Sequence, residues 1–486
     1  MSVVAAFVLC CCSKNFIEDI KPADGTISSA LIFTSREGVE NALTGIYEII
    51  RDYIPPAGKQ NMHGWKSDQL NFDIRTNELI ADPANWWNYE NNWSDNAYGG
   101  NANSVRNLQI WSLNYKVINN ANAIIQKTVA IPESQAVRDS LVGEARSLRA
   151  WAYFNLVRIY QFGYARDTMA PGVPLYTLPS DGASEGNPRA SLRAVYQLIV
   201  SDLEAAIATL GPNRSGKYRI NRNVAQGILA QVYAEMALAN PALWSKAYSN
   251  AAAAVAGFPL MDAAGYNDGF NSVSNPEWIW GLPFNAAQSQ SYAGFFGYLE
   301  PTAITGVPGR YHDLYINTSF ISLFSPTDMR SQFLPAPNQD PSSPWKKWVT
   351  LKFRDNRSQS GDYILMRSAE MILIQAEALT WEGLLQPAID RLFMLQHRRD
   401  PYALPSGARD AYTLIGEILL ERRKELYAET GAAYFDLKRY QLPLIRDGNQ
   451  WSLLQIPATD NHWRWQIPQS EMDTNKSLSA ADQNPL

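Results

Sequence analysis

The sequence of 486 residues predicts a mainly α-helical fold. Several long segments place apolar residues three and four positions apart, which is the spacing of a single helix face. Alanine recurs where helices would meet closely, as in Trp244-x2-Ala247-x3-Ala251, and this spacing suggests tetratricopeptide-like hairpins. Two long stretches lack such a period: 54–103, which we expect to be mostly loop, and 258–360, where we expect loops, short strands and small helices.

The expected helices follow from apolar spacing and from residues that start or stop helices. Ser191 is a suitable N-cap, and Gly257 ends the helix that precedes it. One helix face is formed by Leu141, Ala145, Leu148, Ala152, Leu156 and Ile159, and another by Leu365, Ala369, Ile372, Ala376 and Leu379. Helices are predicted over 40–53, 105–129, 138–162, 191–210, 222–239, 244–256, 363–381, 385–397 and 411–429.

Composition narrows the class of protein. The formal net charge is −5, so the chain lacks the basic surface of a nucleic-acid binder, and we expect no nucleic-acid partner. Aromatic residues are numerous, with 15 Trp, 24 Tyr and 17 Phe, and most of them must belong to a large core. Those outside the helices are therefore the ones to consider as ligand contacts.

The only three cysteines are adjacent: Cys10, Cys11 and Cys12. The remainder of the chain therefore has neither a disulfide framework nor a cysteine zinc site. Residues 3–9 form an apolar run that is too short to cross a bilayer and resembles the end of a secretory signal peptide. With Leu9 at position −3, Cys12 fits the acylated cysteine of a bacterial lipobox.

A lipid on Cys12 would tether the protein to a membrane without a transmembrane helix. Cys10 and Cys11 are alternative acceptors with poorer upstream residues. A third interpretation is three adjacent buried cysteines at an unprocessed N-terminus.

Motifs for catalysis are absent or incomplete. Residues 211–217 match the first seven positions of a P-loop, but Tyr218 stands where Ser or Thr would bind magnesium, and the segment follows a helix instead of a strand. The four histidines are far apart in sequence, and no nucleophile elbow or catalytic cysteine is present. We therefore predict no catalytic residues, no metal site and no cofactor.

A dense run of charge lies at 421–429. The apolar stripe of this helix carries Arg422 inward, where it would need carboxylate partners. We interpret the run as a structural ion-pair network.

Several segments, in order, resemble one family. They are Cys12-Ser-Lys-Asn-Phe16 with Pro22, the long helix from Glu144 to Tyr160 followed by Gly172-Val-Pro174, Met366-Arg367-Ser-Ala-Glu370 with Ala376-Glu377-Ala378, Glu421-Arg422-Arg423-Lys-Glu425, Tyr434-Phe435-Asp436-Leu437-Lys-Arg439, Ile467-Pro468-Gln469-Ser-Glu471 and Gln483-Asn484-Pro485. Together they resemble the SusD/RagB family of outer-membrane lipoproteins. Ser368 departs from the pattern, where the family often has Tyr.

The resemblance implies a single α-helical domain of tetratricopeptide-like hairpins with an irregular, loop-rich ligand-binding half. Residues 1–11 are then a signal-peptide remnant, 12–35 a lipid-anchored segment and 36–486 the SusD-like domain. Within that domain, hairpins at about 36–257 and 362–430 flank a loop-rich insert at about 258–361. The implied protein is not an enzyme. It is a cell-surface lipoprotein of the outer membrane that captures oligosaccharides for a SusC-like TonB-dependent transporter.

A sugar site needs aromatic platforms and polar side chains for the hydroxyl groups. The aperiodic segment 86–98 supplies both, and its candidate ligand contacts are Trp86, Trp87, Asn88, Asn92, Trp93 and Tyr98. The alternative for this segment is a loop that its own tryptophans fix to the body. A second cluster contains Tyr292, Phe295, Phe296 and Tyr298 after Gln288 and Gln290, and its candidate contacts are Tyr292 and Phe296.

Other aromatic residues have simpler interpretations. Trp65 and Asp68 are secondary candidates for ligand contact. Trp278 and Trp280 read as core residues of a strand, and Trp111, Tyr115 and Trp151 as packing residues of helices.

Two alternatives to glycan capture remain. A RagB-like member of the same family would bind peptides, and its site would favour a groove with strand edges and charge. A carbohydrate-active enzyme would need a pair of carboxylates that can be far apart in sequence. The sequence does not identify the sugar, its linkage or its length, and it names no calcium site.

Overall fold

The computed structural model describes residues 32–53, 61–94, 100–181, 183–288, 294–301, 314–337, 339–355 and 360–486. Helices dominate this part of the chain, so the prediction of a mainly helical fold is confirmed. The long helices are α3 (Arg36–Asp52), α4 (Gly64–Ile74), α6 (Val105–Lys127), α7 (Gln135–Tyr160), α8 (Leu192–Thr209), α9 (Arg222–Ala237), α10 (Trp244–Ala254), α15 (Ser368–Trp381), α16 (Leu385–Arg399), α17 (Ala411–Leu426) and α18 (Ala432–Arg439).

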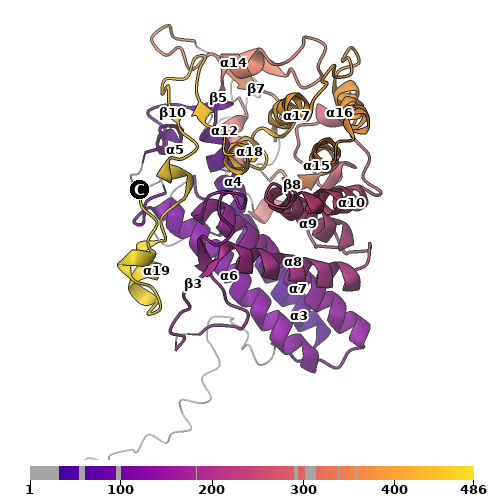
Figure 1. Cartoon of the computed structure of the whole chain (residues 1–486), viewed down its shortest axis with the longest axis vertical. Coiled ribbons are helices and arrows are strands. Elements are labelled where there is room, and N and C mark those ends of the chain that lie inside the picture. Colours follow the sequence, from indigo (N-terminus) through magenta and orange to yellow (C-terminus); the bar gives the residue numbers. More distant parts are fainter. Residues whose placement is uncertain are drawn as a thin grey trace, which may run out of the picture.

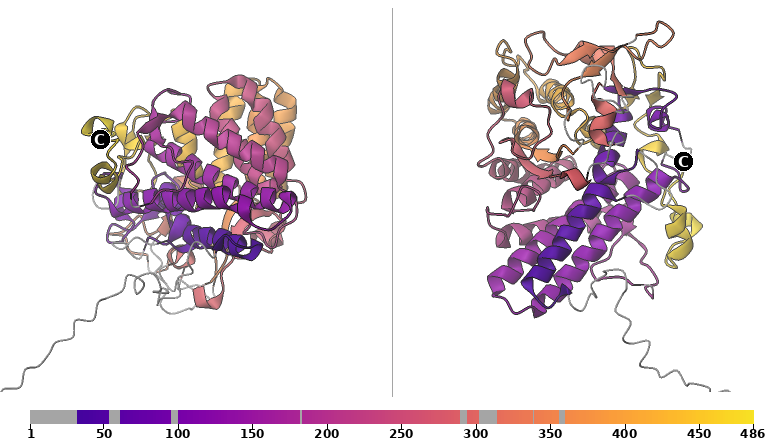
Figure 2. Two further views of the ribbon diagram at one scale, coloured as in Figure 1. Left: turned by 90° about the horizontal axis from the view of Figure 1, so that it is seen from below. Right: turned by 180° about the vertical axis from the view of Figure 1, so that it is seen from behind.

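Most of the long helices form one continuous stack. In chain order, α6 packs on α7, α7 on α8, α8 on α9, and α9 on α10, after which α10 packs on α15, and α15 on both α16 and α17. Figure 1 shows α6 to α8 side by side in the lower part of the molecule, with α9, α10 and α15 to α17 stacked above them on one side. The view from behind in Figure 2 shows the indigo helix α3 lying along this stack, where it contacts α6.

Small residues set the spacing of the stack. Ala247, Ala251 and Ala254 of α10 are fully buried, which confirms the predicted close packing of this helix against α9 and α15. Gly227 in the middle of α9 leaves the space that the side chain of Met366 fills. Ser191 caps α8 by accepting a hydrogen bond from the amide of Ala194, as the sequence predicts.

Short elements occupy the rest of the described chain. The strands pair antiparallel in twos, as β1 (Leu79–Ala81) with β5 (Leu314–Ile316), β2 (Pro171–Pro174) with β3 (Arg189–Ser191), β4 (Trp278–Leu282) with β8 (Tyr363–Arg367), β6 (Phe333–Pro335) with β7 (Trp348–Thr350), and β9 (Leu444–Ile445) with β10 (Gln455–Ile456). Short helices are α5 (Asn88–Asn91), α11 (Ala263–Tyr266), α12 (Phe295–Leu299), α14 (Thr318–Ile321) and α19 (Gln469–Thr474), besides single 3-10 turns. The expected mixture of loops, short strands and small helices is therefore confirmed for the described residues of 258–360.

The sequence misplaced the start of one helix and left two helices, α4 and α18, unpredicted. Residues 54–103 contain the helix α4, in which every residue is buried, and a helix covered on all sides has no apolar stripe to recognise. The predicted helix 363–381 begins as strand β8, whose register against β4 pairs Trp278 with Arg367. Helix α18, which follows Gly431 in a left-handed conformation (φ 69°), was also not predicted.

Aromatic residues assigned to the core lie there. Trp278 and Trp280 are buried in β4, and Trp111 and Trp151 are buried on α6 and α7. Tyr115 packs against Trp111, with ring centroids 4.7 Å apart. The segment 211–217 is a turn between α8 and α9, and its Lys217 donates a hydrogen bond to the carbonyl of Asn275.

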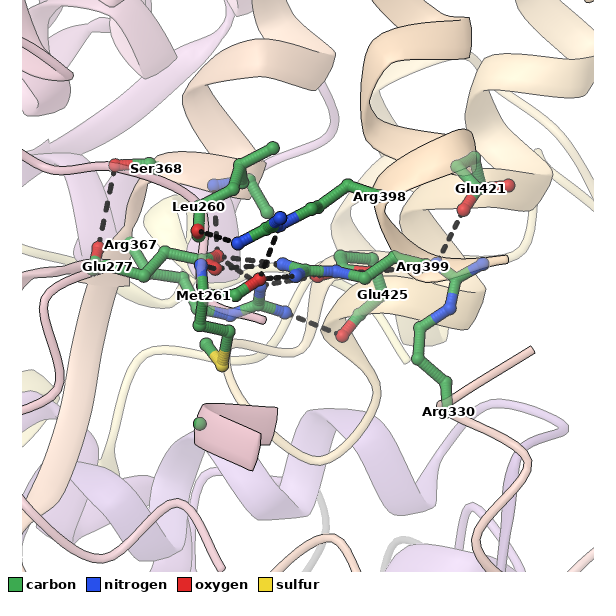
Figure 3. A network of polar contacts seen from close by, with 12 residues as sticks. Leu260, Met261, Glu277, Arg330, Arg367, Ser368, Arg398, Arg399, Glu421 and Glu425 are labelled. Atoms are coloured by element: carbon green, nitrogen blue, oxygen red, sulfur yellow. Dashed lines mark hydrogen bonds and ion pairs between the residues drawn. The ribbon is translucent and has the colours of Figure 1, made fainter. Parts of the chain in front are cut away.

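The centre of the fold is a network of buried charges, shown in Figure 3. The carboxylate of Glu425 in α17 accepts from the guanidinium groups of Arg330, Arg367 and Arg399. Arg367 and Arg399 share a second acid, Glu277, at 2.8 Å each. All five side chains are at most 1% exposed, so none of these charges has solvent as its partner.

Further pairs extend this network. Arg367 also binds Glu429 at 2.7 Å, and Lys352 binds the same carboxylate at 2.6 Å. Burial raises the pKa of the Glu425 carboxyl, but the three guanidinium groups outweigh burial and hold that pKa well below its ordinary value. The inward Arg422 binds Asp436 at 2.6 Å, so the predicted structural ion-pair network is confirmed.

We predict that Arg367→Met destabilises the protein by about 3–5 kcal/mol, because it leaves buried carboxylates without a cation. Urea denaturation measures this loss. The matched control is Arg36→Met, which removes an exposed pair with Glu40 (side chains 54% and 36% exposed) and should cost about 0.5 kcal/mol or less. Equal losses in the two variants would contradict the structural role of the network.

Candidate functional site

The predicted ligand segment forms a short loop and a single helical turn after β1. The side chain of Asp82 accepts from the amide of Ala84 at 2.8 Å, and that of Asn85 accepts from the amide of Trp87 at 3.0 Å. These short polar side chains satisfy backbone amides that no strand or helix pairs, and they lead the chain into α5.

Trp87 connects the two predicted aromatic clusters. Its side chain is fully buried, and its ring meets the ring of Tyr298 edge to face, with centroids 5.5 Å apart. The guanidinium of Arg106 lies 4.9 Å from the Trp87 ring centroid. The structure therefore brings residues near 87 and near 298 together, with these two rings packed on each other in the core.

Trp93 fixes the other end of α5. It is 6% exposed, and its indole nitrogen donates to the carbonyl of Arg75 at 2.7 Å. Its ring packs against Trp463, with centroids 4.9 Å apart. The backbone of Trp93 has φ 49°, a left-handed conformation that costs a non-glycine residue free energy, so these contacts hold it in place.

The remaining candidates differ in exposure. Trp86 and Asn88 are partly exposed, and Asn92 is exposed. Phe296 is 5% exposed and packs against Phe295. Tyr98 and Tyr292 lie outside the described residues, as does Cys12. Contact of any of these candidates with a ligand stays a prediction. Among the candidates that the structure describes, only Trp86, Asn88 and Asn92 have accessible surface.

A buried charge group supports the loop from below. Arg106 of α6 binds Glu90 of α5 at 3.0 Å and Asp68 of α4 at 3.3 Å, and all three side chains are fully buried. Burial raises the pKa of Asp68 to about 7 although Arg106 lowers it. Asp68, a secondary candidate for ligand contact, is thus occupied as a partner of Arg106.

Trp65, the other secondary candidate, is a core residue here. It is 2% exposed and meets Trp151 edge to face, with centroids 5.3 Å apart.

The segment 446–452, which the sequence did not indicate, also contacts the loop. The guanidinium of Arg446 donates to the carbonyls of Ile74 (3.0 Å), Arg75 (2.9 Å) and Asn91. The hydroxyl of Ser452 donates to the side chain of Asn92 at 2.8 Å. Burial lowers the pKa of Arg446 to about 9.

Two further tryptophans lie beside this loop. The indole of Trp451 donates to the carbonyl of Ala81 at 2.7 Å, and Trp451 and Trp345 both pack, partly exposed, on the small apolar cluster around Ile80. Both tryptophans could have been predicted as ligand contacts from the sequence. Each lies in a segment that is rich in proline, serine, asparagine or glycine and has no helical period, the pattern on which Trp86 was chosen. We define the loop surface as Trp86, Asn88, Asn92, Trp345 and Trp451.

The described residues contain no group of three or more His, Cys, Asp or Glu side chains placed to hold a metal ion. The buried acids of the central network already bind arginine or lysine. Among the described helices, none has the length and apolar character needed to span a membrane. The accessible chemistry at the loop surface is therefore that of aromatic faces and amides, which suits binding of a polar ligand with apolar faces.

Comparisons with known proteins point to one family along most of the chain. Residues 29–234 match the model described as "Starch-binding associating with outer membrane", and residues 334–486 match the model of the SusD family. A SusD-like protein of Formosa agariphila is 28% identical over 380 residues, which cover 68% of this chain and 71% of that protein. A SusD-like protein of Bacteroides ovatus is 27% identical over 241 residues, but the match spans only 37% of its length.

Solved structures agree in fold. A SusD-like carbohydrate binding protein from Bacteroides vulgatus has a TM-score of 0.81 and 27% identity over 93% of this chain and 98% of that one. A SusD superfamily protein from Bacteroides thetaiotaomicron has a TM-score of 0.79 and 23% identity, and the match covers 93% of this chain and 100% of that one. At this level of identity the similarity shows the fold alone.

We predict that Trp93→Ala lowers the free energy of unfolding by about 3–5 kcal/mol, because it removes a large buried side chain and its hydrogen bond. Urea denaturation followed by circular dichroism measures this. Trp86→Ala is the matched control in the same loop, and its partly exposed ring should cost less than about 1.5 kcal/mol. A Trp93→Ala variant as stable as Trp86→Ala would contradict the anchoring role of Trp93.

Proposed function

Because this chain belongs to the SusD/RagB family, we propose that it is a cell-surface lipoprotein that captures oligosaccharides and passes them to a SusC-like TonB-dependent transporter. The family model that residues 29–234 match is described as starch-binding, which supports a carbohydrate ligand. The Bacteroides vulgatus relative at 27% identity is described as a carbohydrate binding protein, which supports the same ligand class here. We propose that the chain binds its ligand without transforming it.

The loop surface is our proposed glycan contact. A pyranose ring presents an apolar C–H face that stacks on an aromatic ring, and its hydroxyl groups bond to amides. Trp86 and Asn88 are partly exposed and Asn92 is exposed, all within seven consecutive residues. The side-chain NH2 of Asn88 also donates to the carbonyl of Asn85 at 2.6 Å, which orients this amide. We propose that Tyr98 and Tyr292 add to this surface, and that Phe296, which is buried, supports it.

The set of buried contacts that anchors the loop is the observation that carries this proposal. Trp87 and Trp93 are buried at the two ends of α5, and Arg106 binds its Glu90 from below. A loop fixed in this way loses little conformational entropy when a ligand binds, so more of the contact energy appears as affinity. We therefore assign Trp87 and Trp93 the role of positioning Trp86 and its neighbouring amides.

A peptide ligand is the alternative within the family. Peptides are often bound by strand addition, which needs an unpaired strand edge. At β1, the strand nearest the loop surface, β5 pairs one edge. On the other edge the side chain of Asn91 accepts from the amide of Ala81 at 2.9 Å, and Trp451 and Gln450 donate to carbonyls of β1. Side chains thus occupy the edge that a peptide would need, which favours the glycan.

We predict that Trp86→Ala weakens glycan binding about tenfold, equivalent to about 1.4 kcal/mol, because it removes the stacking platform. The oligosaccharide with the strongest signal on a glycan array serves as ligand in isothermal titration calorimetry. Tyr412→Ala is the control, because it removes an exposed aromatic ring (79% exposed) from α17, away from the loop surface.

Unchanged affinity of a folded Trp86→Ala variant would exclude this ring from the site. Binding on a peptide array with no signal on the glycan array would favour the RagB-like alternative. Release of reducing sugar by the purified protein would contradict the assignment as a binding protein.

We predict that Cys12→Ser abolishes incorporation of labelled palmitate in cells that express the whole chain, because the thiol of Cys12 is our proposed acylation site. Cys10→Ser and Cys11→Ser are the matched controls and should keep the label. Loss of label in Cys11→Ser together with full labelling of Cys12→Ser would move the anchor to Cys11.

A further inference from the structure

A polar cavity of about 70 Å³ lies between α4, α7, α9, α15 and α18, apart from the loop surface. Aromatic rings, among them Trp65, Trp151 and Phe435, form part of its wall. Aliphatic side chains form another part, and the polar or charged residues that matter for its chemistry are Gln69, Arg158, Glu235, Glu370, Arg422 and Asp436. The proposed function makes no use of this cavity.

Four buried polar atoms on the wall have no protein partner among the described residues. They are the acceptors Gln69 Oε1 and Glu370 Oε2 and the donors Arg158 Nε and Arg422 Nη1. Gln69, Glu370 and Arg422 are 7%, 5% and 7% exposed, so bulk water does not reach them freely. Each unpaired buried group of this kind costs about 1–3 kcal/mol, which is too much to leave four unsatisfied.

Other contacts fix these side chains in position. Glu370 accepts from the amide of Gln231 at 2.8 Å through its other oxygen, and Arg422 binds Asp436 at 2.6 Å through Nε. The guanidinium of Arg158 lies between the rings of Phe154 and Phe435, 4.1 and 4.2 Å from their centroids. No carboxylate of the described chain is within ion-pair distance of Arg158. Rotation of the side chains toward one another would break these contacts, so a small ligand must complete the pairing.

The chemistry of the wall selects that ligand. The donors require an acceptor and the acceptors require a donor, and water is both. A cation would face Arg158 and Arg422, whereas an anion would face Glu235 and Glu370. One water needs only about 10–15 Å³ of cavity space, so the cavity of about 70 Å³ has room for several, and it is far below the roughly 300 Å³ of the smallest common ligand pockets.

We propose that this cavity is a structural water site, in which bound waters bridge the guanidinium groups of Arg158 and Arg422 to the carboxylate of Glu370 and to Gln69. The bridges complete ion pairs that direct contacts leave open. They also join α4, the helix whose Asp68 binds Arg106 beneath the loop surface, to α7, α15 and α17 of the helical stack.

A high-resolution crystal structure of the protein tests the site directly. We expect ordered waters within hydrogen-bond distance of Arg158 Nε, Arg422 Nη1 and Glu370 Oε2. A second crystal soaked in sodium bromide distinguishes water from an anion. Absence of density in the cavity, or an anomalous bromide peak in it, would overturn the proposal.

Oxygen-17 relaxation dispersion counts long-lived internal waters in solution. Glu370→Leu should lower this count by at least one, whereas Glu370→Gln, which keeps at the same position a polar group that water can bond to, should leave it unchanged. Gln69→Leu is the second variant if Glu370→Leu does not fold. The same count in wild type and in a folded leucine variant would show that no long-lived water depends on these side chains.

Discussion

The carboxylate of Glu425 is the constraint on which the rest of this fold depends. It receives three guanidinium groups that come from different parts of the chain: Arg330 from the insert, Arg367 from the end of β8 and Arg399 from the end of α16. Every one of these groups is buried, and a buried charge without its partner is far more costly than an exposed one. These pairs therefore hold the segments that carry them to one carboxylate, and the insert is attached to the helical stack at this point (Figure 3).

The same principle operates on a smaller scale beneath the loop surface. Arg106 binds Glu90 and Asp68, and Arg446 donates to carbonyls at the end of α4 and to Asn91. Buried arginines thus position a loop that has little secondary structure of its own. The long helices form a stack that contributes rigidity, and the surface that contacts the ligand in our proposal is built from irregular chain held by these cations.

The interior therefore combines two kinds of polar site. In the central network the charges meet directly, and in the cavity near Arg158 they are separated by a gap that, in our proposal, water fills. Direct pairs fix distances between elements tightly, whereas bridged pairs tolerate small shifts of one helix against another. Helix α4 takes part in both the cavity and the support of the loop surface, so it connects the helical stack to the proposed binding surface.

The sequence by itself determined the features that local patterning controls. Apolar spacing located most of the long helices within a few residues, Ser191 marked a helix start, and the inward position of Arg422 predicted an ion pair that the structure contains. These inferences succeed because a half-buried helix must show one apolar face, and because a charge on that face must find a partner. The order of short motifs along the chain was likewise sufficient to indicate the family.

Only the tertiary structure decided what happens where burial is complete or contacts are distant in sequence. Helix α4 has no apolar stripe because its surroundings cover every face, and β8 is a strand because β4 pairs with it. The tryptophans of the loop look alike in sequence, yet Trp87 and Trp93 lie in the core and Trp86 keeps an accessible ring. That difference depends on Tyr298, Arg106 and Trp463, residues whose proximity no local pattern encodes.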